Sequence, residues 1–502
     1  MKHIPYTAIV RLIAIGILLV AGCGCLLAQM PIKHSIKEPL PPDSVDMELY
    51  NKKHFWRAAA MVGGMDVGLW AFDRFVLDMP CSHISLNSWQ ANLKKGFVWD
   101  NDNLGTNMFM HPYNGNLYFN GARSNGFNYW QSGLFAVAGS AIWELFMENE
   151  YPSTNDIIAT PIGGMAIGEM AWRISDAILN DKTSGWERFE REAAVFLINP
   201  MRGLTRIING DAWRHRATKG RQYGRPAIGI EAGLGAKVIE FKHDRHEAAK
   251  VGPTLDVNVS YGNRYEVRSP KPYDYFLVRA QLNFMTKQPV LSRLNIQGRL
   301  LGKELWPEHP LHVNIGLYQH FDYYDSDTIS NTLKKCPYKL GVPASVGAGI
   351  MVNDTLPSRA SFDAYLHANA VILGGVLSDY YKLDNRNYNL GSGFSIKAGM
   401  HWIWDGDRFS ITAQHQFYRI FTFKGYPKGT DLSKVDEKTL NAQGDHSQAS
   451  FGVTEVRAEY RIWRRMYLGL DLTHYFRVTN YRDFPTVKSS CFSQALSLTY
   501  KL

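Results

Sequence analysis

The chain has 502 residues, 20% of them charged, and a formal net charge of +9. This length exceeds one ordinary domain, so we expect at least two structural units. The basic residues are dispersed without a recognition motif, which argues against a nucleic-acid partner. The slightly negative mean hydropathy argues against a bundle of membrane-spanning helices. It does not argue against a membrane β-barrel, which hides its apolar face in alternate residues.

The first 28 residues have the pattern of a signal peptide and not of a structural element. Lys2 and Arg11 precede an apolar run, Leu12 to Ala21. Two processing sites remain open, a lipobox that ends at Cys23 and a cleavage after Ala28, and we favour the second. The cysteines farther along match neither a disulfide framework nor a zinc site, because they are few and scattered: Cys81, Cys336 and Cys491.

Composition and periodicity divide the mature chain into three parts. Residues 29–54 are rich in proline and polar side chains and predict a periplasmic linker. Residues 55–216 predict an all-helical periplasmic domain, and residues 217–502 predict an antiparallel β-barrel that crosses the outer membrane. The expected fold class is therefore α+β, with a transmembrane barrel of about twelve strands.

The helical part contains four apolar-periodic segments: Phe55–Leu77, Asn128–Glu148, Asp156–Leu179 and Trp186–Ile198. The stretch from Asp100 to Asn128 is rich in Asn and Asp and predicts an extended loop. Charged residues at a bilayer centre cost at least roughly 2.5 kcal/mol each, so we expect the middle helices to pack in the periplasm or against the membrane's inner face. One face of the fourth helix is expected to face water because it is charged: Glu187, Arg188, Glu190, Arg191 and Glu192.

The barrel prediction depends on strict alternation of apolar and polar residues. In the segment that ends at Leu502, Phe492, Leu496, Leu498 and Tyr500 alternate with small polar residues, which gives one apolar and one polar face. A soluble sandwich or ligand-binding barrel is the less favoured alternative. The strand candidates lie near residues 226–236, 253–261, 275–285, 291–301, 311–323, 345–352, 360–373, 394–404, 408–421, 451–462, 466–478 and 492–502.

The connections between these strands give a second signal. From the fifth strand onward they alternate long and short, as the outer loops and periplasmic turns of an outer-membrane barrel do. This parity places the C-terminus in the periplasm. The first three connections break the rule: His243–Gly252 and Gly262–Asp274 are both long, and Thr286–Val290 is short.

The unusual residues of the helical part form ordered motifs: HPYNGNLYFNGARSNG at 111–126, a Trp-containing helix with two Glu, and PSTNDIIATPIGGMAIGE at 152–169. This set resembles a family of Gram-negative envelope proteins, domain-of-unknown-function family 3943, over roughly Phe55 to Arg216. The resemblance implies an envelope location and no established activity. Asn155 and Asp156 are expected to cap the helix that follows them. The glycines Gly163, Gly164 and Gly168 indicate close helix packing.

One group of charged residues in these motifs has two interpretations. Glu144/Glu148 and Glu169/Arg173 are spaced four apart, which puts each pair on one helix face. The favoured interpretation is a buried ionic network neutralised by arginine. The alternative is an active or metal site with His111 as ligand or general base. The candidate cluster is His111, Arg123, Glu144, Glu148, Asp156, Glu169 and Arg173.

The sequence contains no HExxH, CxxC or GxSxG motif, so we expect no cofactor and no metal. Three functions remain open: a structural or transport-type barrel with a helical plug or platform, which we favour, an envelope enzyme that modifies lipid or glycan, and a surface binding protein. The last would use loop tips such as Tyr323–Asp325 and Asp379–Tyr381. Expected partners are lipopolysaccharide, phospholipid and, through the last strand, the barrel-assembly machinery. Polar residues would line a water-filled lumen, among them a ladder of alternating charge: Glu455, Arg457, Glu459 and Arg461.

Overall fold

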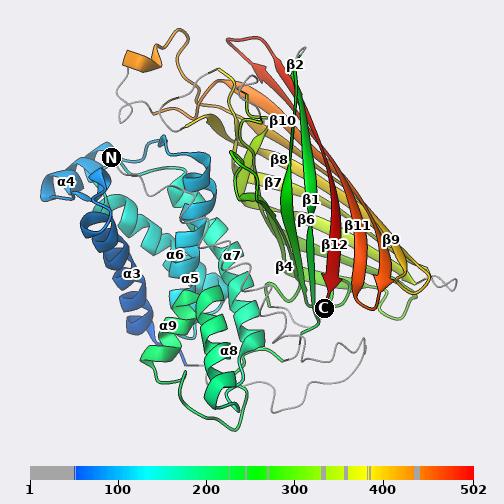
Figure 1. Cartoon of the computed structure of the whole chain (residues 1–502). Helices are drawn as coiled ribbons and strands as arrows, with labels where there is room; N and C mark the ends of the chain where they lie inside the picture. Colours follow the sequence, from blue (N-terminus) through cyan, green and yellow to red (C-terminus); the bar gives the residue numbers. More distant parts are fainter. Residues whose placement is uncertain are drawn as a thin grey trace. The chain divides into compact units, whose positions relative to one another are not determined.

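The computed structural model describes residues 50, 52–224, 226–243, 246–267, 271–329, 335–355, 360–380, 383, 386–434 and 441–502. The predicted signal peptide, with Cys23 and Ala28, and nearly all of the linker lie outside these residues. The described chain forms two compact units, a helical unit that extends to Ala227 and a barrel unit that begins at Ile228 (Figure 1).

The described part of the helical unit contains seven α-helices. Two π-helical segments adjoin them: η3 (Thr106–Met110) leads into α5, and η4 (Trp143–Met147) continues α6. The four predicted helices are confirmed as α3, α6 with η4, α7 and α8. None of the described helices is long and apolar enough to cross a membrane. The helices are α3 (Phe55–Phe75), α4 (Leu86–Lys95), α5 (His111–Arg123), α6 (Tyr129–Ile142), α7 (Asp156–Ile178), α8 (Gly185–Ile198) and α9 (Pro200–Ile208).

The predicted loop over residues 100–128 is wrong, because α5 occupies its centre. Its composition disfavours a helix. Its glycines, however, let the α5 backbone approach a neighbouring helix closely, and the resulting packing stabilises the helix. A Cβ on Gly115 would lie 1.8 Å from the Thr160 carbonyl oxygen of α7, so the two helix backbones touch. The Asn120 side chain donates to Asn116 and to the Gly168 carbonyl, which satisfies polar groups inside the bundle. The predicted close packing of Gly164 is confirmed, with α5 as the partner.

The barrel is closed and antiparallel, with consecutive strands paired and β1 paired to β12. All twelve predicted strands are present, and most are longer than predicted. The strands are β1 (Ile228–His243), β2 (His246–Tyr261), β3 (Phe276–Asn283), β4 (Leu291–Leu305), β5 (Leu311–Asp325), β6 (Lys339–Thr355), β7 (Ser361–Leu377), β8 (Tyr388–Trp404), β9 (Phe409–Phe421), β10 (Ser447–Trp463), β11 (Met466–Tyr481) and β12 (Val487–Lys501).

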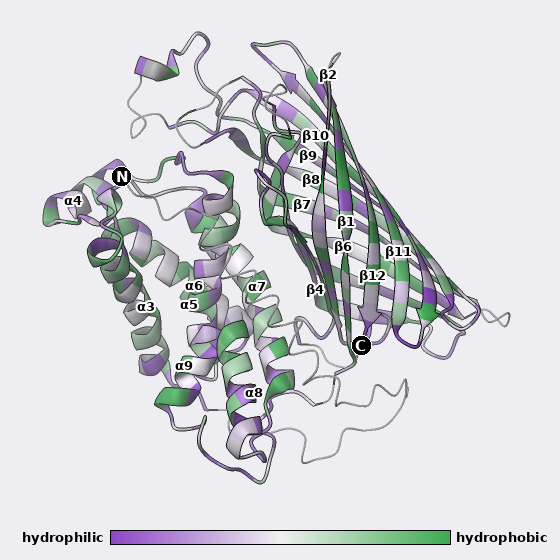
Figure 2. Cartoon of the chain, viewed as in Figure 1, coloured by the Kyte–Doolittle hydropathy of each residue, from purple (hydrophilic) through white to green (hydrophobic). Residues whose placement is uncertain are grey.

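The two faces of the wall differ as predicted. On β12, Leu496 and Leu498 are exposed on the outer face, whereas Ser497 and Thr499 are buried in the interior. Figure 2 shows the resulting alternation of hydrophobic and hydrophilic residues along the strands. Exposed aromatic residues gather at the end of the wall where the chain terminates: Trp306, Trp404, Phe409, Tyr460, Trp463 and Tyr500. This arrangement is typical of an apolar belt with an aromatic girdle.

The alternation of long and short connections is confirmed from β5 to β11, whereas the last connection, residues 482–486, is short. At the tight end, Asp405 and Gly406 both have positive φ, as the central residues of a primed hairpin turn do. The predicted long first connection is wrong, because β1 and β2 pair up to His243 and His246.

Of the two predicted loop tips, Tyr323–Asp325 is wrong, whereas Asp379 and Tyr380 lie in the connection between β7 and β8 as predicted. Tyr323 and Tyr324 are buried within β5. Asp379 is bound by Arg477 in two contacts of 2.6 Å, so it is not presented to a partner. Of its neighbours, Tyr380 stacks on Phe484, and Tyr381 lies outside the described residues.

Side chains fill the lumen, which is therefore not the water-filled channel that the sequence suggested. Toward the end with long loops, an apolar layer crosses the interior: Ile239, Phe241, Met285, Tyr324, Ile329, Tyr338, Leu340, Val342, Val371, Val376, Tyr418, Ile420, Ala449, Phe451, Val453, Tyr475 and Cys491. The predicted charge ladder is present beside it, with Arg293 bound to Glu455, and Arg457 bound to Glu459 at 2.8 Å. The first pair joins β4 to β10 across the interior, whereas the second lies along β10.

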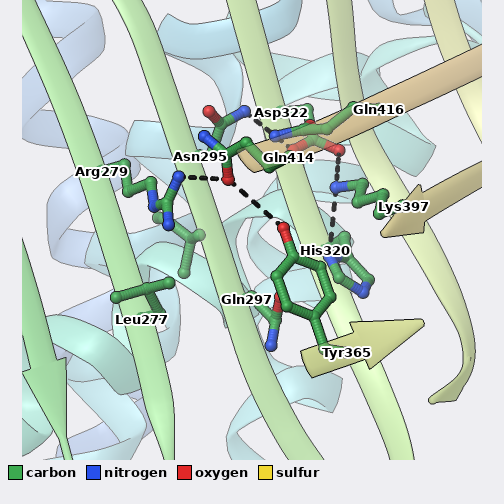
Figure 3. Close-up of a pocket in the computed structure, with 11 residues that line it drawn as sticks. Leu277, Arg279, Asn295, Gln297, His320, Asp322, Tyr365, Lys397, Gln414 and Gln416 are labelled. Carbon is green, nitrogen blue, oxygen red and sulfur yellow. Dashed lines mark hydrogen bonds and ion pairs between the residues drawn. The ribbon is translucent and has the colours of Figure 1, made fainter. Parts of the chain in front are cut away.

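A small cavity of about 30 Å³ remains among the polar lumen residues (Figure 3). Lys397 lies beside it and binds Asp322 at 2.5 Å and His320 at 3.1 Å. At the tight-turn end, the β2–β3 connection contributes Tyr265, which donates to Asp363 on β7 at 2.5 Å. A cavity of this size accommodates water but no larger solute.

Candidate metal centre in the helical unit

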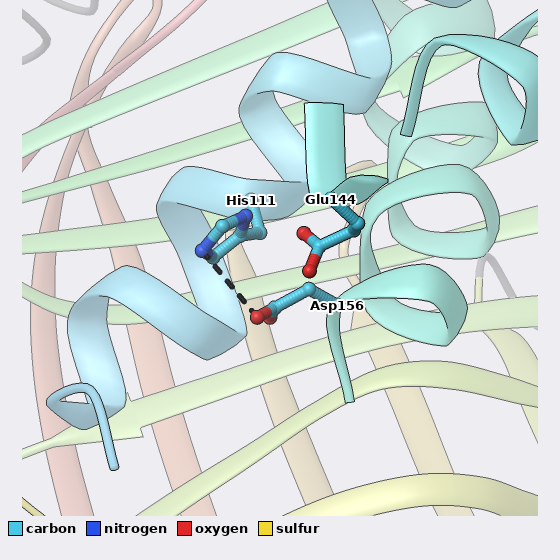
Figure 4. Close-up of side chains that lie close together, drawn as sticks. All are labelled: His111, Glu144 and Asp156. Atoms are coloured by element: carbon cyan, nitrogen blue, oxygen red, sulfur yellow. Dashed lines mark ion pairs between the residues drawn. The ribbon is translucent and has the colours of Figure 1, made fainter. Parts of the chain in front are cut away.

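Three of the predicted site residues converge in the helical unit, each at the end of a helix (Figure 4). His111 is the first residue of α5 and directly follows η3. Glu144 lies within η4, and Asp156 is the first residue of α7. π-Helical segments are rare and occur often at functional sites, and here two of them place His111 and Glu144.

The geometry of the three side chains suits a single cation. One potential ligand atom from each residue lies within 4.8 Å of the other two, and His111 Nε2 is 3.7 Å from Asp156 Oδ2. Metal–ligand bonds of about 2.0–2.2 Å separate ligand atoms by roughly 3–4.4 Å, so a contraction of a few tenths of an ångström would close the site. The histidine–carboxylate distance is too long for a direct hydrogen bond.

Neighbouring polar groups hold the two carboxylates in place. The Ser153 amide donates to Glu144 Oε2 at 2.7 Å, and the Asn155 amide group donates to Asp156 Oδ1 at 3.0 Å. Asn155 also donates to Asp100 Oδ1 at 2.9 Å, and this brings a further carboxylate beside Asp156. Such second contacts orient ligands in metal sites.

The predicted capping role of Asn155 and Asp156 is wrong. The Ser153 hydroxyl accepts the Asp156 amide at 3.1 Å, whereas the Asn155 side chain makes no cap bond. Asn155 is helical in conformation, and its side chain is engaged with the two aspartates. It therefore supports the carboxylate cluster instead of the helix terminus.

The electrostatics of the cluster favour a bound cation. Burial, together with the carboxylates of Asp100 and Glu144, raises the pKa of Asp156 well above its usual value. Burial lowers the pKa of His111, and this effect is opposed by Asp100. A neutral imidazole beside crowded carboxylates is the state that coordinates a metal, and a divalent ion would relieve the repulsion among the acids. One nitrogen and two or more oxygen ligands suit Zn²⁺, Mn²⁺ or Fe²⁺.

Three other members of the predicted cluster form a separate ionic network. Arg123 binds Glu169 through two bonds, of 2.8 and 2.9 Å, and Arg173 binds the same carboxylate at 3.0 Å. All three side chains are buried. The network interpretation is therefore correct for Arg123, Glu169 and Arg173, because arginine neutralises the carboxylate.

Glu148 does not share a helix face with Glu144. The chain leaves the helix at Glu148, which has an extended conformation with φ −138° and ψ 160°. A π-helical turn also has more than 3.6 residues, so an i, i+4 spacing no longer aligns side chains. The Glu148 carbonyl accepts a hydrogen bond from Asn92 at 3.1 Å.

The sequence interpretation missed Asp66 as a buried acid of this bundle. It lies on α3 with no solvent exposure, and burial raises its pKa to about 7, although the Tyr118 hydroxyl opposes the shift. A lone aspartate between Met65 and Val67 in an apolar helix was the signal that could have identified it.

Comparison with known proteins gives a family match for the helical unit. Residues 96–201 match the family model described as "Domain of unknown function (DUF3943)". The resemblance seen in the motifs is thus confirmed over a segment that contains the whole candidate centre. No curated protein gives a significant match.

Among solved structures, the chain is similar to outer membrane channels. The toluene transporter TodX of Pseudomonas putida is 9% identical, with 55% of this chain and 89% of that one covered, at a TM-score of 0.22. A second outer membrane channel, from Pseudomonas putida F1, is 10% identical with 55% and 94% covered, at 0.27. The channel DcaP of Acinetobacter baumannii is 9% identical with 55% and 97% covered, at 0.21. Scores this low carry no statement about what the present chain binds or transports.

Proposed function

We propose that this chain is an integral outer membrane protein whose occluded barrel anchors a helical domain on the periplasmic side. The observation that carries the proposal is the wall itself, with apolar side chains outside, charged side chains inside and aromatic residues at one rim. A surface of this kind is stable in lipid and unstable in water.

The orientation rests on the connections. The connections β4–β5, β6–β7, β8–β9 and β10–β11 are short and share one end of the barrel with the C-terminus, and periplasmic turns are the short ones in this class. The long β2–β3 connection at this end and the short β1–β2 connection at the other end depart from the rule. The chain enters β1 at that same end, where the Ile230 amide donates to the Leu502 carbonyl at 3.4 Å. The helical unit directly precedes β1, and this favours its periplasmic position.

The filled lumen favours a platform for the helical domain over a helical plug, because the barrel's own side chains occupy the interior. We expect wild-type protein in planar bilayers to show no steady conductance. The double variant Tyr324→Ala/Tyr475→Ala removes two rings of the apolar layer and should create ion-conducting events. Leu496→Ala, on the outer face, is the matched control. A steadily conducting wild-type barrel would contradict occlusion and favour the transport function.

The barrel is tested separately by gel mobility with and without heating. A stable closed barrel in the folded state migrates differently from its unfolded chain. Identical mobility in both conditions would contradict the anchor itself.

The convergence of His111, Glu144 and Asp156 favours a second function, a metal-dependent activity in the helical domain. A bound ion would act as a Lewis acid and lower the pKa of a coordinated water, which is how metal-dependent hydrolases generate their nucleophile. His111, Glu144 and Asp156 would hold this ion, and Asp100 and Asn155 would orient the ligands.

Metal content of the purified full chain tests this second function. We expect about one divalent ion per chain after equilibration with Zn²⁺ or Mn²⁺. Asp156→Asn should lose it, whereas Asp78→Asn, an exposed acid of the same unit, should retain it. Equal metal content in all three proteins would overturn the centre and leave the barrel proposal intact.

A further inference from the structure

The helical unit has an inverted distribution of charged and apolar side chains. On α8, Arg188 and Arg191 are each only 7% exposed, whereas Trp186 is 70% and Phe189 58% exposed. The sequence prediction of a water-facing charged side is therefore wrong for the two arginines of this helix, although Glu187 is exposed as predicted. Burial of Arg188 is supported by its bonds to Asp181, at 2.8 Å, and to the Ala212 carbonyl, at 3.0 Å.

The same inversion continues on α9, which packs against α8. Arg202 and Arg206 are buried, and their guanidinium groups bind Asp176 at 2.6 Å and Asp181 at 2.7 Å. The residues that α9 and its C-terminal extension expose are apolar: Leu204, Ile207, Ile208 and Trp213. Figure 2 shows hydrophobic positions on the ribbons of both helices.

The helices α3 and α6 expose apolar residues in the same way. The single fully buried acid of α3, Asp66, points into the bundle, while the exposed residues of the two helices include Trp56, Val67, Phe72, Phe75, Trp130, Leu134 and Val137. Four helices thus present apolar side chains outward, and the core behind them contains buried ion pairs among apolar residues.

Water is a poor solvent for such a surface. Each exposed apolar Å² costs about 25 cal/mol relative to burial, and soluble monomers rarely expose contiguous apolar patches above a few hundred Å². In lipid, apolar side chains are favoured on the surface, and ionisable groups face the protein interior and pair with one another there. The Arg–Asp and Arg–Glu pairs of this bundle have that arrangement.

We propose that the helical unit lies in a phospholipid leaflet, with the exposed faces of α3, α6, α8 and α9 against acyl chains. The occupant of these faces is thus a lipid surface that contains anionic headgroups. This inference concerns the helical unit and goes beyond the anchoring function of the barrel.

A basic pocket supplies the charge complementarity for headgroups. Its volume is about 280 Å³, and it lies between the start of α3 and the end of α9. Six cationic side chains line it, but Arg202, Arg206 and Arg216 are paired with Asp176, Asp181 and Asp211. The cations that remain for a headgroup are Lys52, Arg57 and the 58%-exposed Arg214. The exposed Trp56 and Trp213 are the sequence neighbours of Arg57 and Arg214. Tryptophan beside arginine is typical of the interface between headgroups and acyl chains.

Hydrogen-bonding groups of the pocket suit a headgroup that also carries hydroxyls. Asn125 lines the pocket, is 1% exposed, and its Oδ1 accepts no hydrogen bond from the protein. Ser124 beside it also has an unsatisfied hydroxyl. The phosphate and glycerol hydroxyls of phosphatidylglycerol would satisfy the cations and these two groups together.

Photochemical labelling tests the proposal on the full chain. The protein is reconstituted in vesicles of phosphatidylethanolamine and phosphatidylglycerol that contain a phospholipid with a diazirine in its acyl chain. We expect adducts on peptides that cover Trp186–Leu197 and Leu204–Trp213, at yields comparable with those on β12. Because β12 is the internal standard, labelled strands with unlabelled helices would overturn the proposal and leave the barrel's membrane insertion intact. Protein–protein cross-links at the helices, to a second copy or to the barrel, would also overturn it.

A charge-reversal variant tests the headgroup pocket without disturbing the core. Arg57→Glu/Arg214→Glu changes two exposed residues and should abolish the excess of helix adducts in phosphatidylglycerol over phosphatidylcholine vesicles. Lys94→Glu, an exposed cation on α4, is the control and should keep the excess. Retention of the excess in the double variant would overturn the assignment of anionic lipid to this pocket.

Discussion

The barrel and the helical unit both pair charged side chains inside and expose apolar side chains outside. In the barrel, Arg293 and Glu455 pair inside while Leu496 and Leu498 are exposed outside. In the helical unit, Arg202 and Asp176 pair inside while Ile207 and Ile208 are exposed. Both units therefore have the polarity of proteins whose solvent is lipid.

The two units differ in the residues that fill the interior around their ion pairs. The strands leave a lumen that an apolar aromatic layer fills, so the ion pairs there have an apolar neighbour on one side. The helices touch directly at Gly115 and Gly164, and their ion pairs are enclosed among buried apolar side chains such as Phe119 and Trp172. Loss of one charge should therefore be more damaging in the helical unit, where no lumen admits water to the remaining partner.

The largest expected effect follows from Glu169→Ala. This change leaves Arg123 and Arg173 buried without their shared carboxylate, and the loss of one partner of a buried pair costs about 3–5 kcal/mol. We expect the helical unit of the full chain to become sensitive to limited proteolysis, while the heat-dependent gel mobility of the barrel stays unchanged.

The control is Asp78→Ala, which removes the 82%-exposed partner of Arg74 at 3.4 Å. An exposed pair contributes about 0–1 kcal/mol, so protease resistance should persist. Equal sensitivity of the two variants would refute the distinction between core and surface pairs. Loss of barrel mobility in Glu169→Ala would show that the two units do not fold independently.

The sequence was sufficient to predict the barrel because a strand has a period of two. Once Leu496, Leu498 and Tyr500 define the outer face of β12, every other position follows, and the strand count and the connections from β5 to β11 agree. The apolar layer of the lumen was missed, because its residues come from many different strands and lie near one end of each. Which inward residues meet across a barrel depends on register and closure, which alternation does not encode.

Helical periodicity, in contrast, shows which residues share a helix face, but it does not show which face is buried in the bundle. The charged face of α8 was assigned to water because that is the rule in soluble bundles, and the structure places Arg188 and Arg191 in the interior. The helix α5 was missed because propensity disfavours its Asn, Gly and Pro residues, while packing against α7 rewards the small ones. In both cases tertiary contacts overrule the local signal.

The sequence identified the residues of the candidate site but not which of them lie close together. His111, Glu144 and Asp156 belong to ordered motifs, which identified them, yet only the π-helical turns bring them together. Arg123, Glu169 and Arg173 came from the same motifs and form a separate cluster, because α5 and α7 run side by side for several turns. Sequence spacing within a helix could not separate the two groups.

Matched substitutions on the outer faces give the next largest effect and test whether the two units share a solvent. Leu496→Arg places a charge on the barrel's lipid face and should cost about 2–4 kcal/mol, depending on depth. Ile208→Arg on α9 should cost a similar amount if lipid covers that helix. In water it would change stability by only about 0.5 kcal/mol.

The measurement is the temperature at which each unit loses protease resistance in vesicles, with Lys488→Arg on the barrel and Lys94→Arg on the helical unit as conservative controls. A lowered midpoint for Leu496→Arg together with an unchanged midpoint for Ile208→Arg would separate the solvents of the two units. That result would refute the claim that lipid covers the outer faces of both units.

The smallest expected effect is a pH-dependent gain in stability from Asp66→Asn. Burial raises the pKa of Asp66 from 3.8 to about 7 in the folded unit. Folding therefore favours the protonated acid, and its ionisation destabilises the folded state progressively between about pH 4 and pH 7. The shift corresponds to at most about 4 kcal/mol, and local relaxation leaves a gain on the order of 1–2 kcal/mol for the amide above pH 8.

The stability difference between Asp66→Asn and wild type should consequently grow from about pH 5 to pH 8, when followed as the midpoint of thermal protease sensitivity of the helical unit. Asp78→Asn is the control, because its side chain is 82% exposed and its ionisation should not affect folding. A difference that is constant with pH would mean that Asp66 is neutralised by a cation in the folded protein. The helical core would then resemble the lumen, in which Glu455 and Asp256 both contact arginine. A growing difference would show that this core retains an acid held in its protonated form by burial alone.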